Sequence, residues 1–200
     1  MVIPKVIFKY SYIYDKNWKG WIKAYRKKTQ KYPSAKQIQN YIKKVENLWS
    51  KDEKKILTAL QDITSLKWKS KYIQCYIVGR CIPFSDPLTL SVYDKNLYYF
   101  IDTLIHELIH QLFTQDGNFK QSKKAWNYIR RKYKYTSHRT KIHIPLFAIY
   151  SYIYIKFYGE RRLQMNIKSI IFLTDYKKAW NIVQKEGYQN IIREFTKRIK

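Results

Sequence analysis

One segment near the middle of the chain most constrains what it can fold into: His-Glu-Leu-Ile-His at residues 106–110. The segment lies inside the apolar run Leu104–Phe113, which is typical of a buried helix. Residues four positions apart share one face of an α-helix, so the imidazoles of His106 and His110 would point the same way. Such a pair can hold one tetrahedral Zn²⁺, with Glu107 beside the coordination position that is left for water.

A hydrolytic zinc site needs three protein ligands, and this motif supplies two. We expect His143 to be the third, because it is one of only four histidines in the chain and begins a predicted apolar helix that could pack against the motif's helix. A helix start is rigid and can hold a ligand in place. The positive end of the helix dipole also favours the neutral imidazole, which is the form that binds metal.

Three other side chains stay open as the third ligand. His138 lies in residues 134–141, a segment whose polar and basic composition predicts a solvated loop. Asp116 follows His110 by six positions, and Glu160 stands further along the chain, where it could instead cap the next helix.

The neighbours of the motif suit hydrolytic chemistry. Zinc would lower the pKa of a water molecule and polarise a substrate carbonyl, and Glu107 would accept the proton of the water and pass it to the leaving amine. Leu108 and Ile109 would face away from the metal and bury the helix against the core. Asp102, one turn before His106, could accept the second ring N–H of a ligand histidine and so fix its tautomer.

Hydrophobic periodicity and turn residues predict the remaining elements. Ser34 is expected to cap one helix, and Ser50-Lys-Asp-Glu53 is expected to form a capping box for the next. Helices are predicted over 18–28, 34–49, 50–63, 97–115, 121–133, 143–158, 174–187 and from 188 onward, and strands over 72–78 and 88–93.

These elements predict a mostly helical α+β fold with a small sheet beside the motif's helix. No Pro- or Gly-rich linker divides the 200 residues, so we expect one domain over 1–200. Within it, 1–70 would be a helical N-terminal part, 71–133 the strands with the motif's helix, and 134–200 a helical C-terminal part.

The chain is strongly basic, with 40 Lys and Arg against 14 Asp and Glu and a formal net charge of +26. Such an excess attracts polyanions, so nucleic acid or an anionic membrane surface is a possible partner through the basic surface. Compositional bias could also explain the abundant lysines, although it does not explain the shortage of acids. Cys75 and Cys81 form no CxxC pair, which leaves no zinc-ribbon signal and favours two reduced thiols.

The N-terminus lacks an apolar segment followed by small cleavage-site residues, so no signal peptide is predicted. The longest apolar stretch, Ile142–Tyr158, is too short and too polar to span a bilayer comfortably and is expected to be a buried helix. The expected location is the cytoplasm.

With its His-Glu-Leu-Ile-His helix after a Ser-Asp-Pro-Leu-Thr-Leu-Ser strand, the chain resembles the zincin superfamily of zinc metallopeptidases. The resemblance covers at most Tyr72–Tyr133, and only the HExxH motif in it is specific. It implies a zincin-like fold, a Zn²⁺ cofactor and hydrolysis of a peptide or protein substrate. It also implies that Leu88–Tyr93 is an edge strand that pairs with an extended peptide. In the metzincin branch the last ligand stands at the position of Asp116, and a glycine stands at the position of Phe113. This chain departs from that pattern at Phe113.

Two other functions stay open. The chain could be a non-catalytic zincin-like domain, or a basic nucleic-acid-binding protein in which HExxH is accidental. The intact Glu107 favours catalysis, because a purely structural site would not need it.

Overall fold

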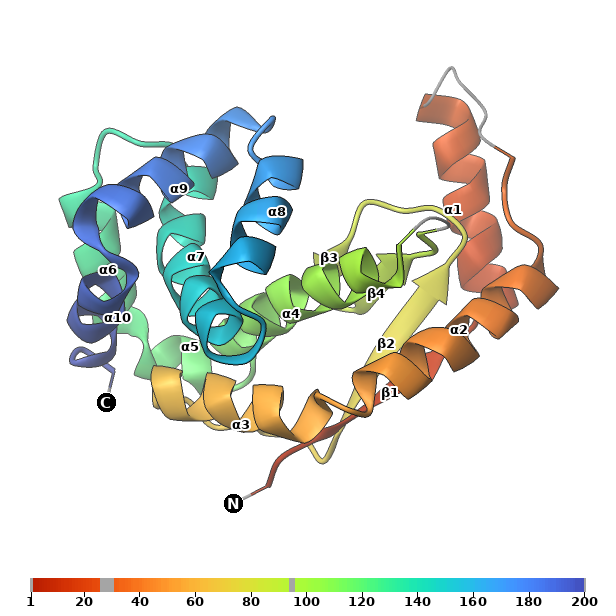
Figure 1. Ribbon diagram of the computed structural model, residues 1–200, viewed down its shortest axis with the longest axis horizontal. Coiled ribbons are helices and arrows are strands. Elements are labelled where there is room, and N and C mark those ends of the chain that lie inside the picture. The colour runs from red at the N-terminus through yellow and green to blue at the C-terminus, as the bar shows by residue number, and fades with distance from the viewer. Residues whose placement is uncertain (1, 26–30, 94–95, 200) are drawn as a thin grey trace. The chain divides into compact units, whose positions relative to one another are not determined.

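A computed structural model describes residues 2–25, 31–93 and 96–199 (Figure 1). The fold is mostly helical with one four-stranded mixed sheet, which confirms the predicted α+β class. The chain divides into two compact units, one made of residues 1–55 and 70–111 and the other of 56–69 and 112–200. Helices α3 (Glu53–Thr64) and α4 (Leu97–Thr114) begin in the first unit and end in the second. That the whole chain is one domain stays a prediction.

The sheet of the first unit has the strand order β1-β2-β4-β3. Strands β1, β2 and β4 are parallel, and the short β3 is antiparallel to β4. The bounds of the remaining elements in this unit are β1 Lys5–Lys9, α1 Tyr12–Tyr25, α2 Ala35–Trp49, β2 Tyr72–Val78, β3 Phe84–Ser85 and β4 Leu88–Ser91.

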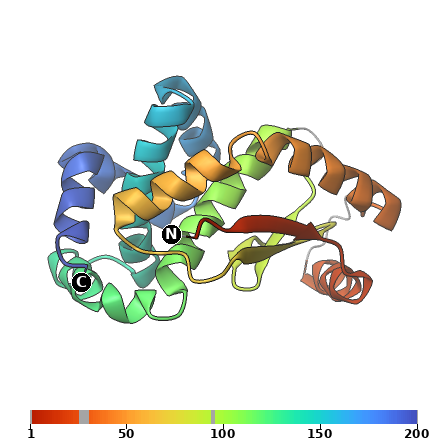
Figure 2. The same cartoon turned by 90° about the horizontal axis from the view of Figure 1, so that it is seen from below.

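Alternating side chains give the sheet two different faces. Phe8 of β1 pairs in register with Cys75 of β2, and both are buried on the face that receives α4. The Phe8 ring lies 5.8 Å from that of Phe100 on α4. On the other face, Tyr76 meets Tyr14 of α1 edge to face, with ring centroids 5.4 Å apart. Figure 2 shows α4 and α1 on opposite sides of the strands, so the motif's helix rests on an apolar sheet surface.

One prediction about the strands was wrong, and two strands were not predicted. The segment 88–93 does form a strand, but β4 lies between β2 and β3 and is not at the edge of the sheet. The edge strand on that side of the sheet is β3, which the turn-rich sequence of 83–87 concealed because only two residues pair. Strand β1 was not predicted, since five residues with lysine at both ends carry little periodic signal.

The helix caps agree with expectation at one position and not at another. Ser34 caps α2, with its hydroxyl accepting from the backbone of Gln37 and the Gln37 side chain accepting from the Ser34 backbone. Ser50 instead ends α2, so the predicted capping box with Glu53 does not form. The Glu53 carboxylate accepts from the Val6 backbone at 2.7 Å, because β1 reaches it from 47 residues away.

The second unit is built around α7 (His138–Phe157), most of whose residues are buried. Helix α7 packs against α8, α9 and α10. Phe113, Trp126 and Phe195 of the same unit form a cluster of edge-to-face rings. The other helices of this unit are α5 Asn118–Gln121, α6 Lys123–Lys132, α8 Glu160–Ile170, α9 Thr174–Glu186 and α10 Tyr188–Thr196. Among the described residues, no helix is both long enough and apolar enough to cross a bilayer.

The start of α7 differs from the prediction. The segment 134–141 was expected to be a loop and His143 to begin the helix, yet α7 begins at His138 and carries Pro145 in its interior. Ser137 caps the helix by accepting from the backbone N–H of Thr140 at 3.0 Å. A capped polar first turn has no apolar periodicity, which is why the sequence pattern did not reveal it.

Candidate metal centre

The His-Glu-Leu-Ile-His motif lies within helix α4, as predicted. Leu108 and Ile109 are fully buried, which confirms that they face the core. His106 and Glu107 are 9% and 7% exposed, and His110 is half-buried. The two imidazole rings have centroids 5.0 Å apart, as expected for positions one helical turn apart on the same face.

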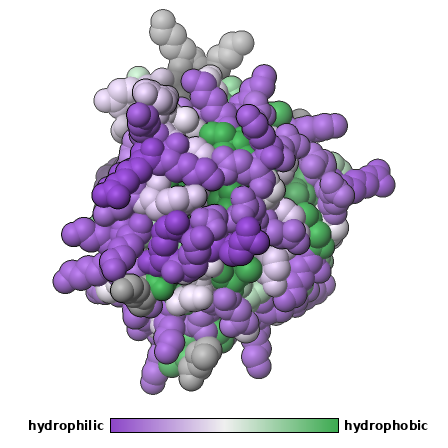
Figure 3. Space-filling view, turned by 90° about the vertical axis from the view of Figure 1, so that its left-hand side faces the viewer, coloured by the Kyte–Doolittle hydropathy of each residue, from purple (hydrophilic) through white to green (hydrophobic). Residues whose placement is uncertain are grey.

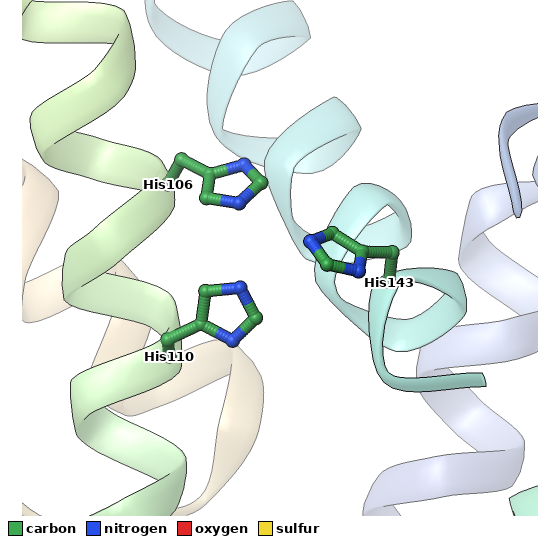
Figure 4. A group of neighbouring side chains, drawn as sticks. All are labelled: His106, His110 and His143. Carbon is green, nitrogen blue, oxygen red and sulfur yellow. The ribbon is translucent and has the colours of Figure 1, made fainter. Parts of the chain in front are cut away.

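The His143 side chain lies beside this pair (Figure 4). One ring nitrogen from each of His106, His110 and His143 can be chosen so that all three lie within 4.8 Å of one another. His143 follows His110 by 33 positions and comes from a different helix, α7. The three imidazoles therefore come from two helices that are distant in the sequence.

A backbone hydrogen bond sets the tautomer of His143. Its Nδ1 lies 2.7 Å from the carbonyl oxygen of Arg139. A carbonyl can only accept, so Nδ1 carries the proton and Nε2 keeps its lone pair. In Figure 4 the ring nitrogen far from the backbone points toward the other two histidines. The lone pair is thus directed into the cluster, which is the arrangement that a metal ligand needs.

Aromatic packing fixes the plane of the same ring. Tyr176 of α9 lies against it with centroids 4.3 Å apart and an angle of 36° between the planes. Phe147, one turn along α7, contacts it at a centroid distance of 5.6 Å. With the backbone hydrogen bond, these contacts leave the ring little rotational freedom.

The first turn of α7 is fixed to α9 by one carboxylate. Asp175 accepts from the hydroxyl of Ser137 at 2.6 Å and from that of Thr140 at 3.0 Å. These hydrogen bonds hold the helical turn that precedes His143. A residue of α9 therefore helps to hold the helical turn that precedes His143.

Burial shifts the protonation of two groups in the site. It lowers the pKa of His143 from 6.5 to about 4, so this imidazole is neutral at neutral pH. It raises the pKa of Glu107 from 4.5 to about 8, because the ionised carboxylate is poorly solvated there. A nearby divalent cation would favour the carboxylate form, which is the form of Glu107 that could accept a proton.

The donor set fits zinc. Three neutral imidazoles are a known ligand set for catalytic zinc and leave a fourth position open. One ring nitrogen from each residue lies within 4.8 Å of the other two, which makes the three imidazoles candidate ligands of one ion.

The alternative third ligands lie elsewhere. Asp116, His138 and Glu160 are all exposed, and none belongs to the histidine cluster. Asp102 is buried one turn before His106, where it stays a candidate for orienting a ligand ring.

Sequence reasoning missed the groups that position His143. The Arg139 carbonyl acts through the backbone, so no side-chain pattern reveals it. Tyr176 and Asp175 lie more than 30 residues further along the chain, in a helix whose packing on α7 only the fold shows.

Comparisons with protein-family models, with curated proteins and with solved structures found no match to this chain.

Proposed function

We propose that this protein is a zinc-dependent peptidase of zincin-like type. The observation that carries the proposal is the approach of His143 to the two motif histidines, with its Nε2 lone pair directed at them. His106, His110 and His143 would hold the ion. A peptide or protein is the proposed substrate, and a cytoplasmic location stays a prediction.

In the proposed hydrolysis, the bound zinc and Glu107 would have different roles. When bound, zinc would supply Lewis acidity toward water and toward the scissile carbonyl. Glu107 would accept a proton as the water oxygen bonds to the carbonyl carbon, and would donate it to the amine nitrogen as the C–N bond breaks. Its burial removes competing solvent, which strengthens its interaction with the reacting groups.

Metal removal tests the proposal. We expect the chelated, metal-free protein to leave a denatured, fluorescently labelled protein substrate intact, and one equivalent of Zn²⁺ to restore cleavage. Magnesium should not replace zinc, because it prefers oxygen ligands in octahedral geometry. The measurement is the rate of fluorescence release together with the metal content. Undiminished cleavage by protein that contains no metal would contradict the proposal.

A further inference from the structure

Residues 117–159 contain ten Lys and Arg and no Asp or Glu. Acids flank this interval directly, at Asp116 and Glu160, but none lies within it. The interval includes α6 and the segment that joins it to α7. The Lys and Arg side chains of this interval therefore have no acidic residue within the interval itself.

Helix α6 presents this charge on one side. Its inner face buries Ala125, Trp126 and Ile129. The basic residues of its outer face are all exposed: Lys123, Lys124, Arg130 and Arg131. Figure 3 views the side of the molecule on which Figure 1 places α6 and α10, and hydrophilic residues cover most of it.

One neighbouring lysine serves a structural role instead. Lys132 contacts the Glu186 carboxylate at 2.5 Å, and the Tyr133 hydroxyl donates to the same carboxylate at 2.9 Å. This acid from α9 compensates the charge of Lys132. We therefore leave Lys132 out of the outer face of α6, which consists of Lys123, Lys124, Arg130 and Arg131.

Exposed aromatic rings lie at both ends of the basic face. Tyr135, three residues after the end of α6, is 90% exposed, and the Lys134 ammonium lies 4.7 Å from its ring centroid. Phe119 on α5, before α6, is 56% exposed. Aromatic faces beside lysines and arginines provide stacking for bases and charge for phosphates.

We propose that the outer face of α6, continued by Lys134 and Tyr135, binds single-stranded nucleic acid. Lys123, Arg131 and Lys134 would contact phosphates, and the Tyr135 ring would stack on a base. Contacts to the sugar-phosphate backbone carry no sequence information, so we expect this surface to show little sequence preference. This binding does not depend on the proposed peptidase activity, since none of these residues belongs to the histidine cluster.

The test compares two triple variants of equal charge. The first replaces Lys123, Arg131 and Lys134 by glutamine on the proposed surface. The control replaces Lys36, Lys43 and Lys44 by glutamine on the exposed side of α2. Binding of a fluorescent single-stranded DNA of mixed sequence is followed by anisotropy at several salt concentrations, with zinc content and thermal unfolding measured on the same samples.

We expect the surface variant to bind about tenfold or more weakly at 0.1 M salt. The slope of log affinity against log salt should fall in magnitude by about 2, at about 0.7 per lost phosphate contact. The α2 control should keep nearly the same affinity at 0.1 M salt and nearly the same salt slope as the unchanged protein. Tyr135→Ala should weaken single-strand binding about fivefold to a hundredfold without changing the slope.

Three results would overturn the proposal. Equal losses in the two triple variants would mean that net charge alone drives binding. An unchanged affinity in Tyr135→Ala together with equally tight duplex binding would rule out the stacked single strand. Loss of binding to phosphatidylserine vesicles in the surface variant, with DNA binding intact, would assign the face to a membrane surface.

Discussion

Replacing Glu107 by glutamine is expected to lower kcat/KM for peptide hydrolysis by about 10²–10⁴ while zinc stays bound at one equivalent. Glutamine has nearly the same shape but cannot accept the proton of the attacking water. The fold should tolerate the change, because burial raises the pKa of Glu107 to about 8, so that without metal this position already holds an uncharged carboxyl group at neutral pH. Activity, metal content and thermal midpoint together separate loss of the base from loss of the site.

Glu160→Gln is the matched control for this variant. Glu160 is exposed, lies outside the histidine cluster and was one of the alternative third ligands. It should keep both activity and zinc. Hydrolysis by Glu107→Gln at the wild-type rate would exclude this carboxylate as the general base.

Replacing His143 by alanine is expected to weaken zinc binding by more than about a hundredfold, which is the upper range for loss of a group that only supports a ligand. The reason is the loss of one of three nitrogen donors, the only one that α7 contributes to the cluster. Competition with a chromophoric zinc chelator measures the affinity. Peptide hydrolysis should be lost with the metal and should recover only in part at high zinc concentration.

His138→Ala provides the control on the same helix. His138 is the exposed first residue of α7, five positions before His143, so its removal should leave zinc affinity unchanged. If His143→Ala kept wild-type affinity and Asp116→Ala lost it, the third ligand would be Asp116. That outcome would replace our ligand set and leave the motif's role intact.

The sequence predicts the scaffold of the site better than its details. Helix α4 and strand β2 were predicted within a residue or two, because their periodicity and flanking turns agree with the tertiary fold. His143 was placed in the correct helix for a partly wrong reason. It lies in the second turn of α7 and not at its start, so burial, more than the helix dipole, favours its neutral form, and the Arg139 carbonyl sets which ring nitrogen carries the proton.

The errors share a physical cause. Strand β3 exists because two residues pair with β4. The Glu53 carboxylate accepts a hydrogen bond from the Val6 backbone because β1 passes beside it. Both interactions join segments that are separated by turns or by many residues, and local propensity does not report them. The same is true of Tyr176, whose ring positions His143 from another helix.

The central claim is that one metal ion binds to three imidazoles contributed by α4 and α7. Anomalous diffraction at the zinc edge, from crystals grown with one equivalent of Zn²⁺, tests it most directly. We expect a single strong peak about 2.0–2.1 Å from one nitrogen of each of His106, His110 and His143. A peak at other residues, or His106 and His110 rings that diverge with no metal between them, would contradict the account.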